Sequence, residues 1–370
     1  MIAFISCAKE QEPNCLITEK PQPIDSSQLS SIIKDYKFVR LETSDNSLIG
    51  GQINKIKKHQ NKYYVLSDWK EILIFNDNGT YVSKISKIGP GPDEYTMASD
   101  FDCSVNNDIV VLAFRKIIIY DSLGILKKKI PISITGFNIK CMTNGNFLVC
   151  TSGEEYVLYV LDSNGDILKK VLKHKPSTRI AKLVPFINIS PDQTLFQIGS
   201  SNNFISYNMK ENDFSNIRLL CNNECISSRE EDKLIEKYHS DYFDISTVKF
   251  IYGMASCKNH LLFRLGNVKK EHICIQDIDN NAEYTVLSIP EDDITYSSPN
   301  FLLNLIEFGD AEDCFISYFY PTQLDVNNVK DEYNDTYKNL IRSFESEKIN
   351  ISDENPILFE FVIKNLTELY

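Results

Sequence analysis

Very few residues of this sequence have the types and spacing that catalysis requires. The five histidines are far apart and none belongs to an HExxH zinc motif: His59, His174, His239, His260 and His272. No GxSxG segment is present, so a serine nucleophile of the hydrolase kind has no support. The cysteine pairs Cys221/Cys225 and Cys141/Cys150 have neither a matching CxxC partner nor a nearby histidine, which argues against zinc. Catalytic residues therefore remain unassigned.

The segment KISKIGPGPDEY, residues 84–95, could bind phosphate or form a rigid corner. It matches neither GxxxxGK[ST] nor GxGxxG, and no helical pattern follows it, so a phosphate-binding loop is not supported. Alternating glycine and proline give the chain a fixed, sharply turning path. We favour a corner between repeated units, and a contribution of Asp93, Glu94 and Tyr95 to a binding surface is the alternative.

One turn resembles part of a calcium-binding loop. The segment DSNGD, Asp162 to Asp166, lacks the sixth-position glycine and the distal glutamate of such a loop. We interpret it as a hairpin turn. No metal site is predicted, and calcium is the cofactor that the sequence leaves open.

The elements that would position functional residues repeat along the chain. Three segments align without gaps: ILIFNDNGTYVSKI from Ile72, IIIYDSLGILKKKI from Ile117 and LYVLDSNGDILKKV from Leu158. In each, an apolar stretch leads to Asn or Asp, and a glycine follows three residues later: Gly79, Gly124 and Gly165. This pattern predicts a β-hairpin, because Asn or Asp opens the turn and glycine takes the positive φ before the return strand.

Weaker copies of the hairpin begin at Phe204 and Ile273, and a sixth copy from Ile357 has lost the turn signal. Two further strand-like stretches precede each hairpin, and the first three hairpins start 45 and 41 residues apart. Four strands at this period are typical of a propeller blade. The sequence therefore predicts an all-β, six-bladed β-propeller of four-stranded antiparallel blades, with residues 31–370 as a single domain.

The predicted ring must also be closed. The sixth unit leaves little room for a fourth strand before Tyr370, and the strand-like segment DYKFVRLE, Asp35 to Glu42, belongs to no other unit. We expect this N-terminal strand to be the outer strand of blade six, where it hides an otherwise exposed sheet edge.

Two long insertions, near residues 222–245 and 322–350, are expected to form short helices on one face. The first contains SREE, which resembles a capping box from Ser228 to Glu231. The second has apolar residues at helical spacing: Val329, Tyr333, Tyr337, Leu340, Ile341 and Phe344. Insertions on one face commonly line a binding surface. A helix that only caps the channel mouth is the alternative.

Loops on the same face supply the remaining candidate binding residues. They are Trp69 in SDWKE, Glu154 and Glu155 in TSGEEY, and Lys269 and His272 in GNVKKEH. An exposed Trp69 could stack on a sugar or anchor a peptide, whereas a structural Trp69 would pack against the adjacent blade. The charged residues give this face mixed charge.

The charge and the N-terminus bear on location and partners. The formal net charge of −12 argues against nucleic acid, because a nucleic-acid groove needs a clustered basic surface. The chain begins MIAFISCAKEQEP, in which an apolar run shorter than a signal-peptide core leads to Cys7 and a polar segment. This start resembles the end of a bacterial lipoprotein signal. It would make Cys7 the lipidated residue, residues 1–30 the signal-like start and tether, and the lipid the only membrane contact.

The glycine–proline run that ends in Glu94 and Tyr95, the DNG turn and the final strand NPILFEF carry a resemblance. They resemble the six-bladed β-propeller lipoproteins of Bacteroidetes, which are distantly similar to NHL-repeat and TolB-type propellers. Members usually read Gly-x-Gly-Pro-Gly-Glu-Tyr or Phe at this corner, and this chain has Asp93 in place of the last glycine. The resemblance extends from about Asp35 onward. It implies the fold and export to the periplasm or cell surface, and it implies no particular activity.

Two functions follow as hypotheses. We expect an exported, lipid-anchored, monomeric propeller that binds a protein or glycan partner through its insertion-bearing face, with no catalytic activity evident. The alternative is a metal-dependent hydrolase, lactonase or lyase with its site at the mouth of the central channel. Carboxylates and amides clustered on inner strands would favour the enzyme, and an exposed apolar patch on the insertion-bearing face would favour binding.

Overall fold

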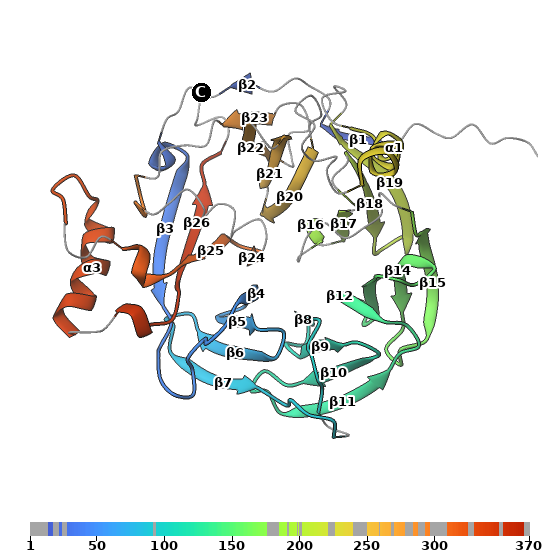
Figure 1. Cartoon of the computed structure of the whole chain (residues 1–370), viewed down its shortest axis with the longest axis horizontal. Helices are drawn as coiled ribbons and strands as arrows, with labels where there is room; N and C mark the ends of the chain where they lie inside the picture. The colour runs from blue at the N-terminus through green and yellow to red at the C-terminus, as the bar shows by residue number, and fades with distance from the viewer. Residues whose placement is uncertain are drawn as a thin grey trace, which may run out of the picture.

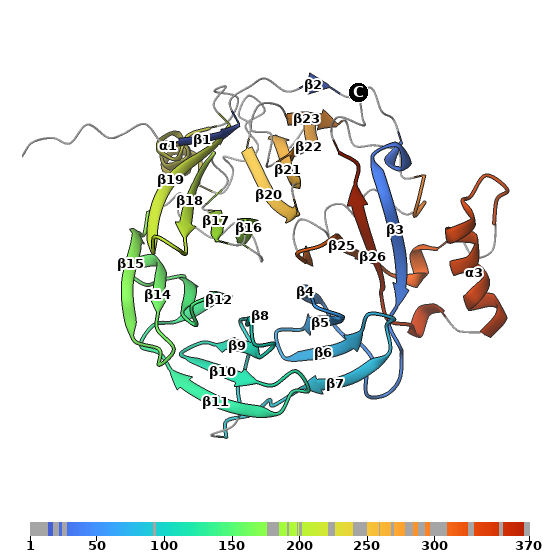
Figure 2. The same cartoon turned by 180° about the vertical axis from the view of Figure 1, so that it is seen from behind.

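The chain folds into a ring of six β-sheet blades, as the repeat predicts (Figures 1 and 2). The structure is a computed structural model. It describes residues 14–17, 22–23, 28–91, 94–175, 185–190, 192–197, 199, 202–220, 226–239, 250–258, 260–267, 270–277, 284–287, 293–296, 309–324, 329–347 and 351–365.

Blades one to five each contain four antiparallel strands that follow the chain from the centre of the ring outward. Blade one consists of β4 (Ile53–His59), β5 (Lys62–Ser67), β6 (Glu71–Asn76) and β7 (Tyr81–Ile85). Blade two consists of β8 (Asp100–Cys103), β9 (Ile109–Ala113), β10 (Lys116–Tyr120) and β11 (Leu126–Pro131). Blade three consists of β12 (Gly136–Cys141), β13 (Phe147–Thr151), β14 (Tyr156–Leu161) and β15 (Ile167–Lys173). Blade four consists of β16 (Phe186–Ser190), β17 (Gln193–Gln197), β18 (Asn203–Asn208) and β19 (Asp213–Leu220). Blade five consists of β20 (Phe250–Cys257), β21 (His260–Asn267), β22 (Lys270–Asp277) and β23 (Tyr284–Leu287).

Blade six is assembled from both ends of the chain. Its sheet contains β25 (Phe315–Phe319), β26 (Ile357–Ile363) and the N-terminal strand β3 (Ile33–Arg40). Strand β3 pairs with β26 in antiparallel register, with Phe38 opposite Phe359, so the predicted closure is confirmed. The short strand β24 (Gly309–Asp310) precedes β25 and pairs in parallel with β4, which ties blade six to blade one at the centre.

The N-terminal segment also reaches two other blades. Strand β1 (Asn14–Ile17) pairs in parallel with β19, and β2 (Gln22–Pro23) pairs in parallel with β23. Parts of residues 1–30, expected to be a signal-like start and tether, thus add a fifth strand to blades four and five. Strands β1, β2 and β3 thus pair with the outer edges of three consecutive blades (Figure 1).

The predicted hairpin turns form between the third and fourth strands of the blades. Gly79, Gly124 and Gly165 have φ values of +86°, +85° and +89°, as the pattern requires. In blade two the Asp121 carboxylate accepts hydrogen bonds from the backbone N–H groups of Leu123 and Ile125, at 2.9 Å each. The Asn or Asp and the glycine that predicted each turn therefore also explain its observed backbone conformation.

The hydrophobic core lies between neighbouring blades. One cluster between blades one and two includes Tyr64, Ile72, Phe101 and Val111, each no more than 2% exposed. Comparable clusters of described residues lie at the other blade boundaries. The middle strands pack against a neighbour on both faces, so they are almost continuously apolar. The outer strand β15, by contrast, alternates between partly buried and exposed residues.

The capping box of helix α1 (Ser228–Tyr238) lies one residue earlier in the chain than the sequence predicts. Its N-cap is Ser227, whose hydroxyl accepts from the Glu230 N–H while the Glu230 carboxylate accepts from the Ser227 N–H. The capping box is therefore Ser227–Glu230, and the predicted Ser228–Glu231 box is wrong by one position.

Helix α3 (Asp335–Glu347) is shorter than the apolar pattern predicts. Val329 and Tyr333 precede it, because Asn334 ends the preceding turn and its side-chain oxygen accepts from the Tyr337 N–H at 2.8 Å. The helix lies outside β3, and α1 lies outside blade four, so neither helix lies over the centre of the ring (Figures 1 and 2). Among the described residues no helix is long and apolar enough to cross a membrane.

Candidate functional site

The segment 84–95 forms a corner between blades one and two. The Tyr95 N–H donates to the Lys87 carbonyl at 2.8 Å, and the Gly89 N–H donates to the Tyr95 carbonyl at 3.1 Å, so the chain doubles back. The Glu94 carboxylate accepts from the Gly91 N–H at 2.8 Å and occupies the space that a side chain at Gly89 or Gly91 would need. Tyr95 is 1% exposed, and its hydroxyl donates to the Lys70 carbonyl at 2.7 Å. These contacts give Glu94 and Tyr95 a structural role in holding the corner.

Trp69 lies in the tight loop between β5 and β6 with a φ of +56°. Its backbone N–H donates to the Asn54 side-chain oxygen, and its backbone carbonyl accepts from the Ala98 N–H, both at 2.7 Å. The half-buried indole packs against the cluster between blades one and two. The structure thus places Trp69 against the adjacent blade.

The remaining candidates lie on other blades. In the loop between β13 and β14, Glu154 accepts from the Thr135 N–H at 2.9 Å, and the exposed Glu155 lies 3.4 Å from Lys173. His272 belongs to β22, where its backbone pairs with Leu265. In the described part of the chain, no hydrogen bond or ion pair joins Trp69, Glu94 and Glu154. Asp93, Lys269 and Cys7 lie outside the described residues.

A cavity of about 700 Å³ lies where the innermost strands of the blades converge. All six blades contribute to its lining, through Lys57 and His59, Asp102, Lys140, Asn188, Ala255 and Asp310. These residues lie toward the carboxyl ends of the inner strands, and Met209 of a hairpin turn also lines the cavity. The cavity is therefore on the hairpin-turn side of the ring. Of the candidate residues chosen from the sequence, Trp69, Glu94, Tyr95, Glu154 and Glu155 lie between strands on the opposite side.

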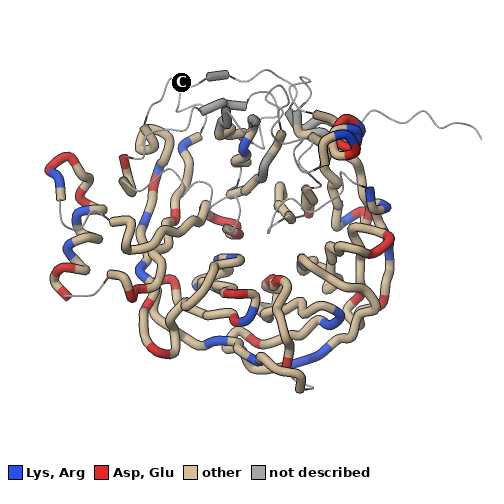
Figure 3. The backbone as a smooth tube through the Cα atoms, viewed as in Figure 1, with Lys and Arg blue, Asp and Glu red and all other residues tan. Residues whose placement is uncertain are grey.

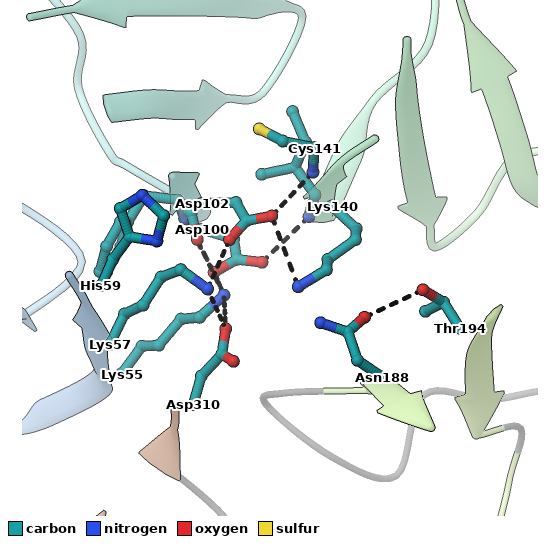
Figure 4. Close-up of polar contacts among 12 residues, drawn as sticks. Lys55, Lys57, His59, Asp100, Asp102, Lys140, Cys141, Asn188, Thr194 and Asp310 are labelled. Carbon is teal, nitrogen blue, oxygen red and sulfur yellow. Dashed lines mark hydrogen bonds and ion pairs between the residues drawn. The ribbon is translucent and has the colours of Figure 1, made fainter. Parts of the chain in front are cut away.

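Two lysines and two aspartates, Lys57, Lys140, Asp102 and Asp310, form one wall of this cavity, and Lys55 and Asp100 are joined to them by ion pairs (Figure 4). Lys57 Nζ lies 2.9 Å from both Asp102 Oδ1 and Asp310 Oδ2. Lys55 Nζ lies 3.0 Å from Asp100 Oδ1 and donates to the Phe101 carbonyl at 2.8 Å. We call the set Lys55, Lys57, Lys140, Asp100, Asp102 and Asp310 the lysine–aspartate network. Its formal charges cancel, and in Figure 3 segments of both signs face the centre of the ring.

Backbone groups of blade three also bind the aspartates of blade two. The Ile139 N–H donates to Asp100 Oδ2 at 2.9 Å, and the Cys141 N–H donates to Asp102 Oδ2 at 2.7 Å. Such donors favour the ionised form of a carboxyl group. Burial nevertheless raises the pKa of Asp100 above its usual value despite these donors and Lys55, whereas Lys140 and Lys57 outweigh burial at Asp102 and lower its pKa. The network therefore joins the inner strands of blades six, one, two and three by charge-assisted hydrogen bonds.

Burial and charge act in opposite directions on these groups. Burial alone would lower the pKa of Lys57, but Asp102 and Asp310 outweigh it and hold that pKa well above its usual range. Burial alone would raise the pKa of Asp310, but Lys57, Lys140 and Lys55 hold it well below its usual range. The ionised forms of both groups are therefore favoured at neutral pH.

The opposite wall of the cavity, formed by blades four and five, carries one charged residue among its described lining positions, Lys258, which directly follows β20. It contains Phe186, Asn188, Met254, Ala255 and Ser256. The cavity thus combines a charged wall with a largely apolar one, the combination found in many small-molecule sites.

The sequence contains a signal for this network that the motif search does not detect. Lys55 and Lys57 alternate along β4, and Asp100 and Asp102 alternate along β8. Residues two apart on a strand lie on the same face, so each pair projects to one side. Charged residues at this spacing in inner strands of consecutive repeats could have indicated a shared charged wall.

The described residues give no support to a metal centre. No group of three or more His, Cys, Asp or Glu in this part of the chain is placed to hold a metal ion. In the DSNGD turn, the Asp162 carboxylate accepts from the backbone N–H groups of Asn164 and Asp166, at 2.8 and 3.0 Å. That carboxylate is used within the hairpin turn.

Known structures share this fold at low sequence identity. A crystal structure of a protein presumed to be exported, from Bacteroides fragilis, is 17% identical, with 95% of this chain and 100% of that one covered and a TM-score of 0.73. A protein of unknown function from Bacteroides caccae is 12% identical over 64% of this chain and 82% of its own, with a TM-score of 0.43. A streptogramin B lyase is 14% identical over 81% and 85%, with a TM-score of 0.45. No curated protein matches the sequence. A model of the family described as Domain of unknown function (DUF4934) matches residues 16–361, so this chain belongs to that family.

Proposed function

We propose that this chain is an exported, lipid-anchored protein that binds a glycan or a segment of a partner protein in its central cavity. The observation that carries the proposal is the convergence of side chains from all six blades on one cavity of about 700 Å³. Ligand sites commonly have roughly 300–1,000 Å³ and combine apolar walls with a few polar groups.

Binding fits this cavity better than metal-dependent hydrolysis or elimination. The inner-strand carboxylates that would favour an enzyme are present, but each is held by a lysine. Asp102 and Asp310 share Lys57, and Asp100 binds Lys55. The lysines lower the pKa values of Asp102 and Asp310, the two that line the cavity, and a carboxylate of lowered proton affinity is a weak general base. The network thus serves better as a fixed, polar wall.

Export and anchoring rest on the N-terminal sequence. The apolar run before Cys7 resembles a lipoprotein signal, and the similar protein from Bacteroides fragilis is presumed to be exported. In cells that export the chain, we expect the unchanged protein in the membrane fraction and a Cys7→Ala variant in the soluble fraction. Equal distribution of the two proteins would refute the anchor.

The location of the binding site can be tested by blocking each side of the ring separately. Thermal shifts would be measured with panels of oligosaccharides and peptides, since a ligand at a hundredfold excess over its Kd adds about 2.7 kcal/mol to stability. We expect Ser256→Tyr, which places a large side chain in the cavity, to abolish the shift. Trp69→Ala, on the insertion-bearing side, should leave it unchanged. The reverse result would place the partner on the insertion-bearing face that the sequence favours.

A further inference from the structure

Lys140 has unused hydrogen-bonding capacity inside the cavity. Its side chain is 9% exposed, and Nζ lies 3.8 Å from Asp102 Oδ2, which is too long for a hydrogen bond. No acceptor among the described residues receives a hydrogen bond from this ammonium group, whereas Lys55 and Lys57 each donate to oxygens within 3.0 Å. A buried ammonium group with three N–H donors is strongly stabilised by any acceptor that reaches it.

Asn188 presents a second donor to the same space. Its side-chain oxygen accepts from the Thr194 hydroxyl at 3.0 Å, which fixes the amide with its nitrogen toward the cavity. Figure 4 shows the Lys140 ammonium group and the Asn188 amide nitrogen directed into the same part of the cavity. Two donors that converge on one space repel each other unless an acceptor lies between them. The pair is therefore arranged to hold an oxygen-bearing group.

We propose that the cavity binds a sugar acid, with the ligand carboxylate between Lys140 Nζ and Asn188 Nδ2; this inference rests on the proposed function. A carboxylate supplies acceptors for both donors. A phosphate monoester carries more negative charge, and it would lie beside Asp102 and Asp310 in a network whose charges already cancel. A monoanion is therefore the better match.

The remaining lining favours a hydroxylated ligand body. Ser256, Thr143 and Ser190 bring hydroxyl groups to the cavity, and Met254 and Ala255 supply an apolar surface. A pyranose ring has hydroxyl groups at its edge and apolar C–H faces, so it can satisfy both kinds of surface. A uronic acid combines such a ring with one carboxylate.

The inference can be tested by isothermal titration calorimetry with D-glucuronate and D-galacturonate, compared with neutral D-glucose and D-galactose. We expect the uronates to bind the unchanged protein more tightly than the neutral sugars. Lys140→Gln and Asn188→Asp should each weaken uronate binding about ten- to hundredfold, the effect of one charge-assisted hydrogen bond. Asn188→Asp keeps the side-chain shape, so it separates ligand recognition from folding if Lys140→Gln proves unstable.

Lys58→Gln is the matched control. Like Lys140 of β12, Lys58 of β4 is a largely buried lysine, but it pairs with Asp313 and Glu360, both at 3.2 Å, and does not line the cavity. Its loss should leave uronate binding unchanged.

Four outcomes would overturn the inference. Equal binding of uronates and neutral sugars, blocked by Ser256→Tyr, would remove the carboxylate site while leaving the proposed function intact. Binding of glutamate-rich peptides through Lys140, without uronate binding, would assign a protein ligand instead. No binding of uronates to the unchanged protein would refute the sugar-acid site, and binding of any ligand that survives Ser256→Tyr would refute the cavity as the binding site.

Discussion

Lys57 of blade one and Asp102 of blade two form an ion pair of 2.9 Å in which both side chains are at most 2% exposed. Asp310, next to blade six, completes the arrangement from the other side of Lys57 at the same distance. Three consecutive segments of the ring are therefore held together at its centre by charge as well as by apolar packing.

Replacement of Lys57 by methionine should destabilise the protein strongly. The change keeps most of the side-chain volume but leaves Asp102 and Asp310 buried without their shared cation. Breaking a buried ion pair by removal of one partner costs about 3–5 kcal/mol. The free energy of unfolding from urea titration would measure this loss.

Lys127→Met provides the control for this prediction. Lys127 lies only 2.7 Å from Asp108, a shorter ion pair, but its side chain is 50% exposed. A surface pair contributes roughly 0–1 kcal/mol, so the same substitution should have a small effect here. Similar losses for the two variants would mean that burial does not determine the strength of the Lys57 pair.

The network predicts a specific loss of stability in acid. The lysines hold the pKa values of Asp102 and Asp310 below their usual range despite burial, which acts in the opposite direction. The stabilisation that these carboxylates provide is therefore complete above the unfolded-chain pKa of about 4, and it is lost as the pH falls toward the lowered folded-state values. Urea unfolding at a series of acidic pH values should show this decline.

Asp310→Asn isolates the contribution of one carboxylate to that decline. The variant should be less stable at neutral pH, because Lys57 loses a partner, and its stability should fall less steeply in acid, because one titrating group is gone. An acid slope identical to that of the unchanged protein would contradict the prediction.

Gly79→Ala should be more damaging than Gly145→Ala. Both glycines have nearly the same positive φ, +86° and +84°, so backbone strain of about 1–2 kcal/mol is common to both substitutions. A Cβ at Gly79 would lie 1.9 Å from the Arg40 carbonyl oxygen of β3, whereas nothing lies within 4 Å at Gly145. The clash should add about 1–3 kcal/mol, measurable as a lower Tm. Equal Tm values for the two variants would show that β3 moves away from the new side chain with no loss of stability.

Deletion of residues 1–41 should abolish cooperative folding. It removes β3 and with it the buried side chains of Ile33, Val39 and Leu41, each worth roughly 1.5–3 kcal/mol. It also exposes the edge of β26. Thermal unfolding followed by circular dichroism should lose its single sharp transition. Deletion of residues 1–13, which retains β1, β2 and β3, should leave the transition in place, and a sharp transition in the longer deletion would refute the role of β3 in closure.

Much of the architecture was predictable because it depends on short-range patterns. The Asn or Asp and glycine at fixed spacing determine each hairpin turn, and the apolar stretches around them determine the strands. The closing strand was predictable by elimination, because one strand-like segment had no place in another unit. The predicted starts of the two helices were less accurate. The Ser227 capping box was displaced by one position, and Asn334 begins α3 later than its apolar pattern indicates.

The residues of the proposed binding site were not predictable in the same way. Trp69, Glu94 and Tyr95 stood out because of their residue types, yet the structure engages all three in the corner and the blade boundary. Lys57, Asp102, Lys140 and Asn188 belong to four different blades and form no local motif.

The sequence by itself thus determined the propeller, because each blade is specified by turns and strands within about 45 residues of chain. Only the tertiary structure decided which inner-strand side chains meet. Ring closure brings Asp310 to within 2.9 Å of Lys57, although 253 residues separate them. Such a contact depends on the relative position of blade six and blade one, and that position is set by the packing of all six blades and by the N-terminal strand.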